Sequence, residues 1–215
     1  MDHLSGVRPV RHHERMTEIR RAALHDLPGV YRVCIQTGDA GSDATEVYRD
    51  PDLLGHVFVG PYVVGASEFA LIVVDDEGVA GYCLAARDTR AFASWAEQEW
   101  WPPLRSAFPK RPTGTPDADV IALFHHPPIA PAGVVDDYPA HLHIDLLERI
   151  RGGGWGRRLI ERQLEQLAAA GVEACHLTVA ATNENAIAFY RHLGWDVLRK
   201  GEEEWYMGIR LKAAQ

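Results

Sequence analysis

Arg151-Gly-Gly-Gly-Trp-Gly156 is a glycine-rich turn that follows an apolar stretch, His141-Leu-His-Ile-Asp-Leu-Leu147. The residues after it carry apolar side chains at helical spacing, namely Leu159, Ile160, Leu164 and Leu167. A turn that opens into a helix presents unpaired N–H groups at the positive end of the helix dipole, and the absent Cβ atoms let an anion approach closely. Arg151 and Arg157 flank the turn and can add charge-assisted hydrogen bonds. The stretch therefore predicts a site for the phosphate of a nucleotide-like ligand.

Two common glycine motifs do not fit this turn. A dinucleotide fingerprint needs G-x-G-x-x-G and an acidic residue about 20 residues later, and the next strand ends without such a carboxylate. A P-loop needs G-x-x-x-x-G-K-[ST], whereas Gly152 is followed by Arg157 and Arg158 with no Ser or Thr. On the glycine run alone, a flexible connection without a ligand and binding of ATP or NAD both stay open.

Two separated motifs point to one family. The spacing R-x-x-G-x-G, at Arg151, Gly154 and Gly156, resembles the acyl-CoA pyrophosphate motif of the GNAT superfamily of N-acetyltransferases. Downstream, Thr182-Asn-Glu-Asn-Ala-Ile-Ala-Phe-Tyr-Arg-His-Leu-Gly-Trp195 resembles the second signature, N-x-x-A-x-x-x-Y-x-x-x-G-[FW]. The motifs occur in the right order, with a helix and a strand between them. The resemblance covers about 140–211 well and about 16–87 loosely.

A narrower resemblance is also visible. His-Leu-His-Ile-Asp followed by Gly-Trp-Gly, together with Trp100-Trp-Pro-Pro-Leu104, is similar to bacterial relatives of the acetyltransferase-like C-terminal domain of O-GlcNAcase.

The superfamily resemblance implies a cofactor, acetyl-CoA (coenzyme A), and a set of binding residues. In the superfamily the strand before the turn splays from its neighbour and pairs with the pantetheine arm, which places Leu146 and Leu147 there. The residues implied around the pyrophosphate are Arg151, Gly152, Gly153, Gly154, Trp155, Gly156 and Arg157. Asn183 and Asn185 are implied as further CoA contacts, although Asn183 also suits a helix cap. Family members often have Pro where Glu148 stands, and that departure changes only a turn residue.

The catalytic residues are expected on the strand before the turn and on the second motif. Leu142, Ile144 and Leu146 alternate with three polar residues, His141, His143 and Asp145, which indicates a wet cleft or a satisfied buried network on one face. Asp145 is the first candidate for the general base and His143 the second. By resemblance, Tyr190 protonates the departing thiolate while N–H groups near Leu146 and Leu147 stabilise the oxyanion.

Composition limits the class of protein. The 215 residues suggest one domain, and 47% hydrophobic with 24% charged residues is ordinary for a soluble protein. No apolar run is long enough to span a membrane, and no signal peptide is recognisable. Cys34, Cys83 and Cys175 have no paired spacing, so neither a disulfide framework nor a metal site is expected. The net charge of −8 argues against nucleic-acid binding. We expect a cytoplasmic monomer or homodimer.

The order of elements predicts a GNAT-like three-layer α/β domain with a mixed, splayed central sheet flanked by helices. Residues 1–15 are expected to be an N-terminal extension, and 16–215 a single domain that begins with a strand at Met16. Asp26 is expected to cap a helix that ends at Gly38, and Thr45–Tyr48 to be helical. A hairpin is predicted over 69–85. The Trp- and Pro-rich insertion at about 100–139 is expected to form a packed lid over the acceptor site.

The function that follows is acetyl-CoA-dependent N-acetylation of a primary amine by direct attack. The acceptor, a small molecule or a peptide, is not identified by the sequence. A non-catalytic acyl-CoA-binding module is the alternative, because the glycine turn and Tyr190 favour cofactor binding in both. Only release of CoA that depends on an acceptor separates the two.

Overall fold

A mixed sheet of seven strands runs through the molecule in the order β1-β2-β3-β4-β5-β7-β6. The computed structural model describes residues 17–110, 112 and 114–212. The strands are β1 (Glu18–Arg21), β2 (Ala70–Asp75), β3 (Gly78–Ala86), β4 (Ala140–Leu146), β5 (Ala174–Ala180), β6 (Asp196–Lys200) and β7 (Glu204–Arg210). Every neighbouring pair is antiparallel except β4 and β5, which are parallel. The mixed sheet confirms the predicted fold class.

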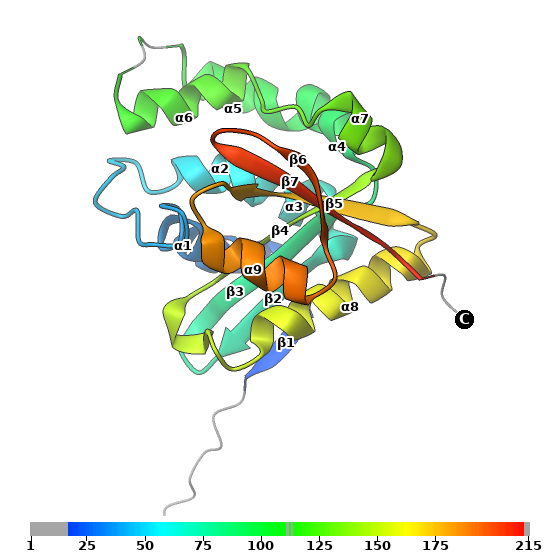
Figure 1. Ribbon diagram of the computed structural model, residues 1–215. Helices are drawn as coiled ribbons and strands as arrows, with labels where there is room; N and C mark the ends of the chain where they lie inside the picture. Colours follow the sequence, from blue (N-terminus) through cyan, green and yellow to red (C-terminus); the bar gives the residue numbers. More distant parts are fainter. Residues whose placement is uncertain (1–16, 111, 113, 213–215) are drawn as a thin grey trace, which may run out of the picture.

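Helices cover both faces of the sheet, because the central strands are apolar on both sides. On β2 and β3, Ile72, Tyr82 and Leu84 pack in one cluster with α1 (Leu27–Ile35), α2 (Leu53–Phe58) and α3 (Gly60–Gly65). Leu71, Cys83 and Ala85 point the other way, toward α8 (Trp155–Ala169) and α9 (Glu184–His192). Figure 1 shows α8 and α9 in front of the sheet. The three cysteines are free and buried.

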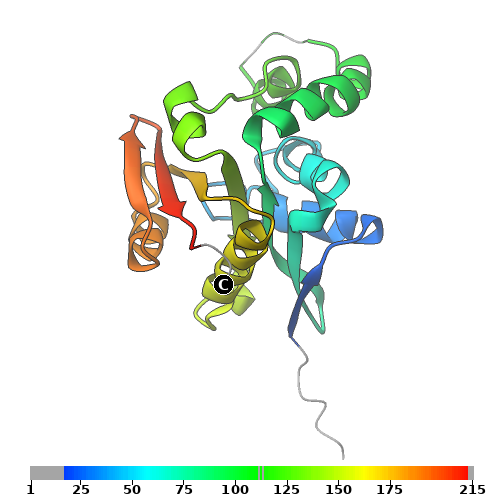
Figure 2. The ribbon, with the colours of Figure 1, turned by 90° about the vertical axis from the view of Figure 1, so that its right-hand side faces the viewer.

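The sheet opens between β4 and β5. The β3–β4 ladder extends over six residue pairs, from Gly81–Leu146 to Ala86–His141, whereas β4 pairs with β5 only at Ala140 and His141. β5 then continues with β7 along its whole length. Seen from the side, α9 and the β6–β7 hairpin stand apart from the blue and cyan half of the molecule (Figure 2). The predicted splay is therefore present, and it lies directly before the glycine turn.

A helical cap, defined here as residues 89–110, 112 and 114–137, lies over the end of the sheet where β4 begins (Figure 1). It comprises α4 (Thr89–Trp95), a π-helix (Ala96–Trp100), α5 (Trp101–Ala107), α6 (Pro116–His125) and α7 (Ala132–Asp137). Trp101 and Phe124 are buried, and their rings stack at 6.2 Å between centroids. The insertion is thus packed, as its aromatic residues predict. In the described part of the chain, no helix is both long and apolar enough to cross a membrane.

Three local expectations need correction or lie outside the structure. Thr45–Tyr48 forms turns, because the Asp43 carboxylate accepts hydrogen bonds from both the backbone N–H and the hydroxyl of Thr45 and so competes with a helix. Asp26 precedes α1 without capping it, since its carboxylate binds Arg20 and the N–H of Ala23. The extension 1–15 and a strand start at Met16 fall outside the described residues, so the domain boundary stays a prediction.

Candidate functional site

The glycine turn presents a row of unpaired N–H groups. The first N–H of α8 with a backbone acceptor is that of Arg158, which donates to the carbonyl of Gly154 at 3.1 Å. Among the described residues, none supplies an acceptor to the six preceding N–H groups, from Gly152 to Arg157. Together with the dipole of the fifteen-residue helix α8, they form a cradle for an anion. We call residues 152–157 the N–H cradle.

Each glycine of the cradle has its own structural reason. Gly152 and Gly154 have φ of +75° and +77°, a conformation that side chains rarely adopt, and the space around their missing Cβ atoms is open. A Cβ on Gly153 would meet the Trp155 ring at 3.2 Å. A Cβ on Gly156 would lie 3.1 Å from Leu146 and 3.4 Å from Phe189. Gly156 therefore lets the start of α8 approach both the end of β4 and α9.

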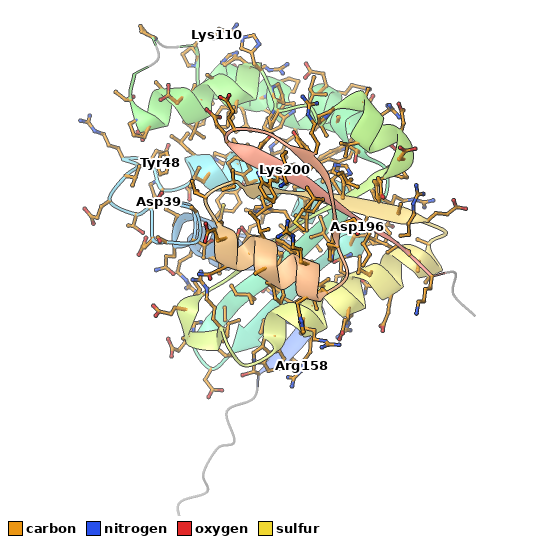
Figure 3. The ribbon with its side chains drawn as sticks, viewed as in Figure 1. Asp39, Tyr48, Lys110, Arg158, Asp196 and Lys200 are labelled. Carbon is orange, nitrogen blue, oxygen red and sulfur yellow. The ribbon has the colours of Figure 1, made fainter. Side chains whose placement is uncertain are left out.

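The two arginines beside the cradle are already engaged. Arg151 donates to the carbonyls of Leu146 (2.8 Å) and Gly41 (2.7 Å), and so ties loop 39–42 to the end of β4. Arg157 pairs with Glu161 at 2.7 Å on the helix surface. Figure 3 shows Arg158, the next residue, pointing outward from α8. The anion-binding capacity of the turn thus rests on its backbone N–H groups.

The two asparagines of the second motif differ in their surroundings. Asn183 accepts from the N–H of Ala186 and caps α9, and its amide donates to the carbonyl of Ala40 in loop 39–42 at 3.3 Å. Asn185 is exposed on the first turn of α9. The predicted cap is confirmed, and Asn183 joins Arg151 in holding loop 39–42, a loop that the sequence motifs do not mark.

The backbone of β4 faces two directions. The N–H of Leu147 donates to Ala80 at 2.8 Å, so alternate residues of the antiparallel ladder, Asp145 and Leu147, direct their backbone groups to β3. Ile144 and Leu146 direct theirs to the opposite side, into the gap beyond the short β4–β5 pairing. The expectation that Leu147 offers its N–H to a ligand is corrected: its N–H and its carbonyl, which accepts from Ile150, are both occupied.

The polar face of β4 carries a hydrogen-bonded triad with a tyrosine that sequence reasoning missed. The hydroxyl of Tyr82, which is fully buried on β3, donates to Asp145 Oδ2 at 2.5 Å. His143 Nε2 lies 3.1 Å from both that oxygen and the Tyr82 hydroxyl. Burial, and then the Asp145 carboxylate, raise the pKa of Tyr82 well above its usual value, so it remains a donor. A carboxylate only accepts, and His143 Nε2 therefore carries a hydrogen and Nδ1 the lone pair.

His141, the third polar residue of this face, is a structural histidine. Tyr62 donates to its Nε2 at 2.7 Å, and its Nδ1 lies 2.8 Å from the Thr89 hydroxyl, which donates to the carbonyl of Pro139. Both ring nitrogens of neutral His141 are thereby satisfied. Burial, and then the neighbouring His176 and His143, lower the pKa of His141 to about 3. The relay joins the helical cap to β4.

We expect acid to destabilise the protein through His141. His141 binds a proton near pH 6.5 in the unfolded chain but only at about pH 3 in the folded chain. The stability that neutral His141 allows is therefore complete above pH 6.5 and is lost progressively as the pH falls from 6.5 toward about 3. One such proton changes the free energy of unfolding by at most about 1.4 kcal/mol per pH unit. Urea unfolding at neutral and mildly acidic pH should show a smaller acid loss in His141→Gln than in the wild type. His25→Gln, at a residue that is 79% exposed, is the control. Equal acid losses in wild type and His141→Gln would contradict this role.

A cavity of about 770 Å³ lies between the helical cap and the opening of the sheet. Its floor includes His141 and His143 from β4, and His176 and Thr178 from β5. Asp145 does not line the cavity, whereas His143 does and has a side chain that is 35% exposed. His176 was missed by sequence reasoning, although the alternation of His176 and Thr178 with apolar residues on β5 repeats the pattern on β4.

Tyr190 lies on α9, buried beside Trp195 with their rings 5.9 Å apart. Burial, and then the Asp145 carboxylate, raise the pKa of Tyr190, so the phenol keeps its proton at neutral pH. Its hydroxyl has no hydrogen-bond partner within the described ranges. Phe189, the preceding residue, lies close to Gly156 of the cradle. In residues 17–110, 112 and 114–212, no cluster of His, Cys, Asp or Glu could hold a metal ion.

The sequence profile of the Acetyltransferase (GNAT) family matches residues 56–195, which is more than half of the chain. The chain belongs to the GNAT family of acetyltransferases. The first of the two motifs that carry the resemblance forms the N–H cradle, and the second lies along α9. The family match confirms the resemblance.

Three known proteins are similar to this GNAT acetyltransferase over most of its length. It is 35% identical to SsHAT, covering 90% of this chain and 98% of that one with a TM-score of 0.85. Protein O-GlcNAcase of Rattus norvegicus is 23% identical over 182 residues, which are 82% of this chain and 20% of that protein. The chain thus spans about a fifth of the length of this curated relative. yncA of Salmonella typhimurium, solved with its cofactor acetyl-CoA, has 14% identity and a TM-score of 0.53, covering 91% of this chain and 94% of that one.

Proposed function

We propose that this protein transfers the acetyl group of acetyl-CoA to a primary amine by direct attack. The proposal rests on three features that meet at β4: the N–H cradle that follows the strand, the unpaired edge of the strand, and the cavity that its residues line. The cradle suits a pyrophosphate because it offers six N–H groups and no side chain at its glycines. The solved complex of the relative with acetyl-CoA supports the choice of cofactor.

The edge of β4 would hold the arm of the cofactor. Ile144 and Leu146 direct backbone groups into the gap, where an extended chain with amide groups could pair as an added strand. The carbonyl of Leu146 accepts from Arg151, so its N–H is the group left for the ligand. Bound acetyl-CoA supplies an activated thioester carbon. The N–H of Leu146, or of Ile144, is placed to stabilise the oxyanion that forms on attack.

His143 is our candidate for the general base, with Asp145 as its positioning residue. Asp145 has its Oδ2 occupied by Tyr82 and His143, whereas His143 lines the cavity with a lone pair on Nδ1. His143 would remove a proton from the incoming ammonium, and Asp145 would stabilise the resulting imidazolium. This order reverses the expectation from sequence. Tyr190, held in its neutral form, would donate its proton to the thiolate that leaves and would regain a proton from the attacking nitrogen as the amide forms.

Release of CoA in the presence and absence of amines tests the proposal. We expect thiol release from acetyl-CoA to depend on the amine and on its concentration, and mass spectrometry to detect an N-acetyl product. If acetyl-CoA binds but no amine in a broad screen accelerates thiol release, transfer is wrong. The protein would then be a non-catalytic acyl-CoA-binding module.

A further inference from the structure

We propose that the acceptor is a monoamine with a flat apolar body, whose nitrogen binds between His143 and His176. This inference rests on the proposed acetyl transfer and names the substrate class of the same site. Four properties of the cavity support it: its apolar walls, the sign of its charged groups, the hydrogen-bonding state of its histidines and its mouth.

The walls of the cavity are predominantly apolar and include several aromatic rings. Phe58 from α2, together with Phe92 and Trp101 from the helical cap, faces Leu142 of β4 and Leu177 of β5. A volume of about 770 Å³ accommodates a small molecule. Rings of this kind gain energy from burying a flat apolar group, and they offer few partners for a polyhydroxylated ligand. The walls thus favour an apolar body.

The charged groups of the cavity favour a cation. Among the described residues, its lining contains the carboxylates of Glu97, Glu203 and Glu204 and no Lys or Arg. Glu97 is neutralised by Arg105, which binds it through two hydrogen bonds. Glu204 accepts from the Tyr206 hydroxyl at 2.7 Å. A hydrogen bond from a neutral hydroxyl leaves Glu204 charged, so the carboxylates of Glu203 and Glu204 both remain as negative charges on the rim, where they favour a cationic ammonium group.

Lys200 is a basic residue near the rim whose ammonium group is engaged outside the cavity lining. Figure 3 shows Lys200 at the end of β6, below the helical cap. Its Nζ lies 4.3 Å from the centroid of the Trp205 ring and is held there by a cation–π contact. Lys200 is not among the residues that line the cavity.

Two histidines line the cavity from opposite sides of the sheet opening, and each has one ring nitrogen left as an acceptor. His176 Nδ1 lies 2.7 Å from the carbonyl of Tyr138, so Nδ1 carries the hydrogen and Nε2 the lone pair. His143 has the opposite arrangement, with its lone pair on Nδ1. Burial lowers the pKa of His176, which keeps it neutral and able to accept. An ammonium has only donors, so it matches both rings.

The mouth of the cavity exposes an apolar side chain that a ligand would cover. Ile129 is 88% exposed, on the proline-containing loop between α6 and α7, and it lines the cavity. An apolar ligand in the cavity would remove part of the Ile129 side chain from water, which would stabilise the complex. Because the Ile129 side chain is almost fully exposed, its replacement should leave the stability of the fold unchanged.

A matched panel of amines tests the acceptor class. We expect kcat/KM for 2-phenylethylamine to exceed that for ethanolamine, which lacks the apolar body, by about tenfold or more. 2-Phenylethanol, which lacks the amine, should inhibit only weakly. An aminoglycoside or a lysine peptide that is acetylated more efficiently than 2-phenylethylamine would overturn the inference and leave the proposed transfer standing.

Two substitutions of lining residues test whether the cavity sets the preference for 2-phenylethylamine. Ile129→Ser and Glu203→Gln should each raise KM for 2-phenylethylamine several-fold and leave KM for acetyl-CoA unchanged. Leu24→Ser, at a residue 66% exposed that does not line the cavity, is the control and should change neither constant. An unchanged KM in both cavity variants would contradict the inference.

Binding separates failure of the acceptor class from failure of the proposed function. If no amine accelerates thiol release, saturation-transfer NMR of 2-phenylethylamine is measured in the presence of CoA. Binding that weakens in Ile129→Ser would support the ligand class and refute the transfer. Absence of binding would overturn the ligand class itself.

Discussion

Replacing His143 by alanine is expected to lower turnover by about 10²- to 10⁴-fold, because a positioned general base contributes on that order. The affinity for acetyl-CoA should stay within a few-fold, since His143 lines the acceptor cavity and not the N–H cradle. The loss should shrink as the pH approaches the pKa of the acceptor, because free amine then becomes abundant without a base. A pH–rate profile with any accepted amine makes the measurement.

Asp145→Asn should also lower turnover, by less than His143→Ala does and for a different reason. The amide keeps the size of the side chain but cannot stabilise the imidazolium, so kcat should fall while KM for the amine changes little. The pH–rate profile of Asp145→Asn should differ from that of the wild type in the same direction as the profile of His143→Ala, because the two residues act together. The double variant should then be no slower than His143→Ala alone.

Tyr190→Phe removes only a hydroxyl from a buried ring, and it should lower turnover while affinity for acetyl-CoA stays within a few-fold. Unlike the loss in His143→Ala, the loss in Tyr190→Phe should not shrink as free amine becomes plentiful, because the proton it supplies goes to the leaving thiolate. Near wild-type turnover of all three variants across the pH range would exclude these residues as acid and base. An ordered water would then be the better candidate.

Gly154→Val is expected to weaken acetyl-CoA binding by at least about tenfold, because a branched side chain would fill the space that the pyrophosphate needs above the cradle. A Cβ at Gly154 meets no other atom of the protein within 4 Å, so any clash arises with the ligand. The φ of +77° adds backbone strain that must be controlled. Titration calorimetry with acetyl-CoA measures the affinity.

Gly171→Val supplies a closely matched control. Gly171 follows the opposite end of α8, has a φ of +80° and likewise has nothing within 4 Å of its missing Cβ. Both variants should lose similar stability, and only Gly154→Val should lose affinity. Unchanged affinity in Gly154→Val, or an equal loss in both variants, would refute the cradle as the pyrophosphate site.

The sequence by itself determined the frame of the site. Glycine at Gly154 and the helical pattern after it fix the cradle, because backbone conformation and a helix start are local properties. The hairpin over 69–85 and the alternation on β4 are equally local, since strand residues point to opposite faces with a period of two. These elements appear in the structure as the sequence predicts, as does the cap that Asn183 makes on α9.

Only the tertiary structure decided which groups are free to act. The register of β3 against β4 occupies the N–H of Leu147 and leaves Leu146 facing the gap. Tyr82 lies 63 residues before Asp145 in the chain, yet its hydroxyl donates to the Asp145 carboxylate. His143, and not Asp145, lines the cavity. Hydrogen bonds between strands depend on pairing across long sequence separations, and a local pattern carries no information about that pairing.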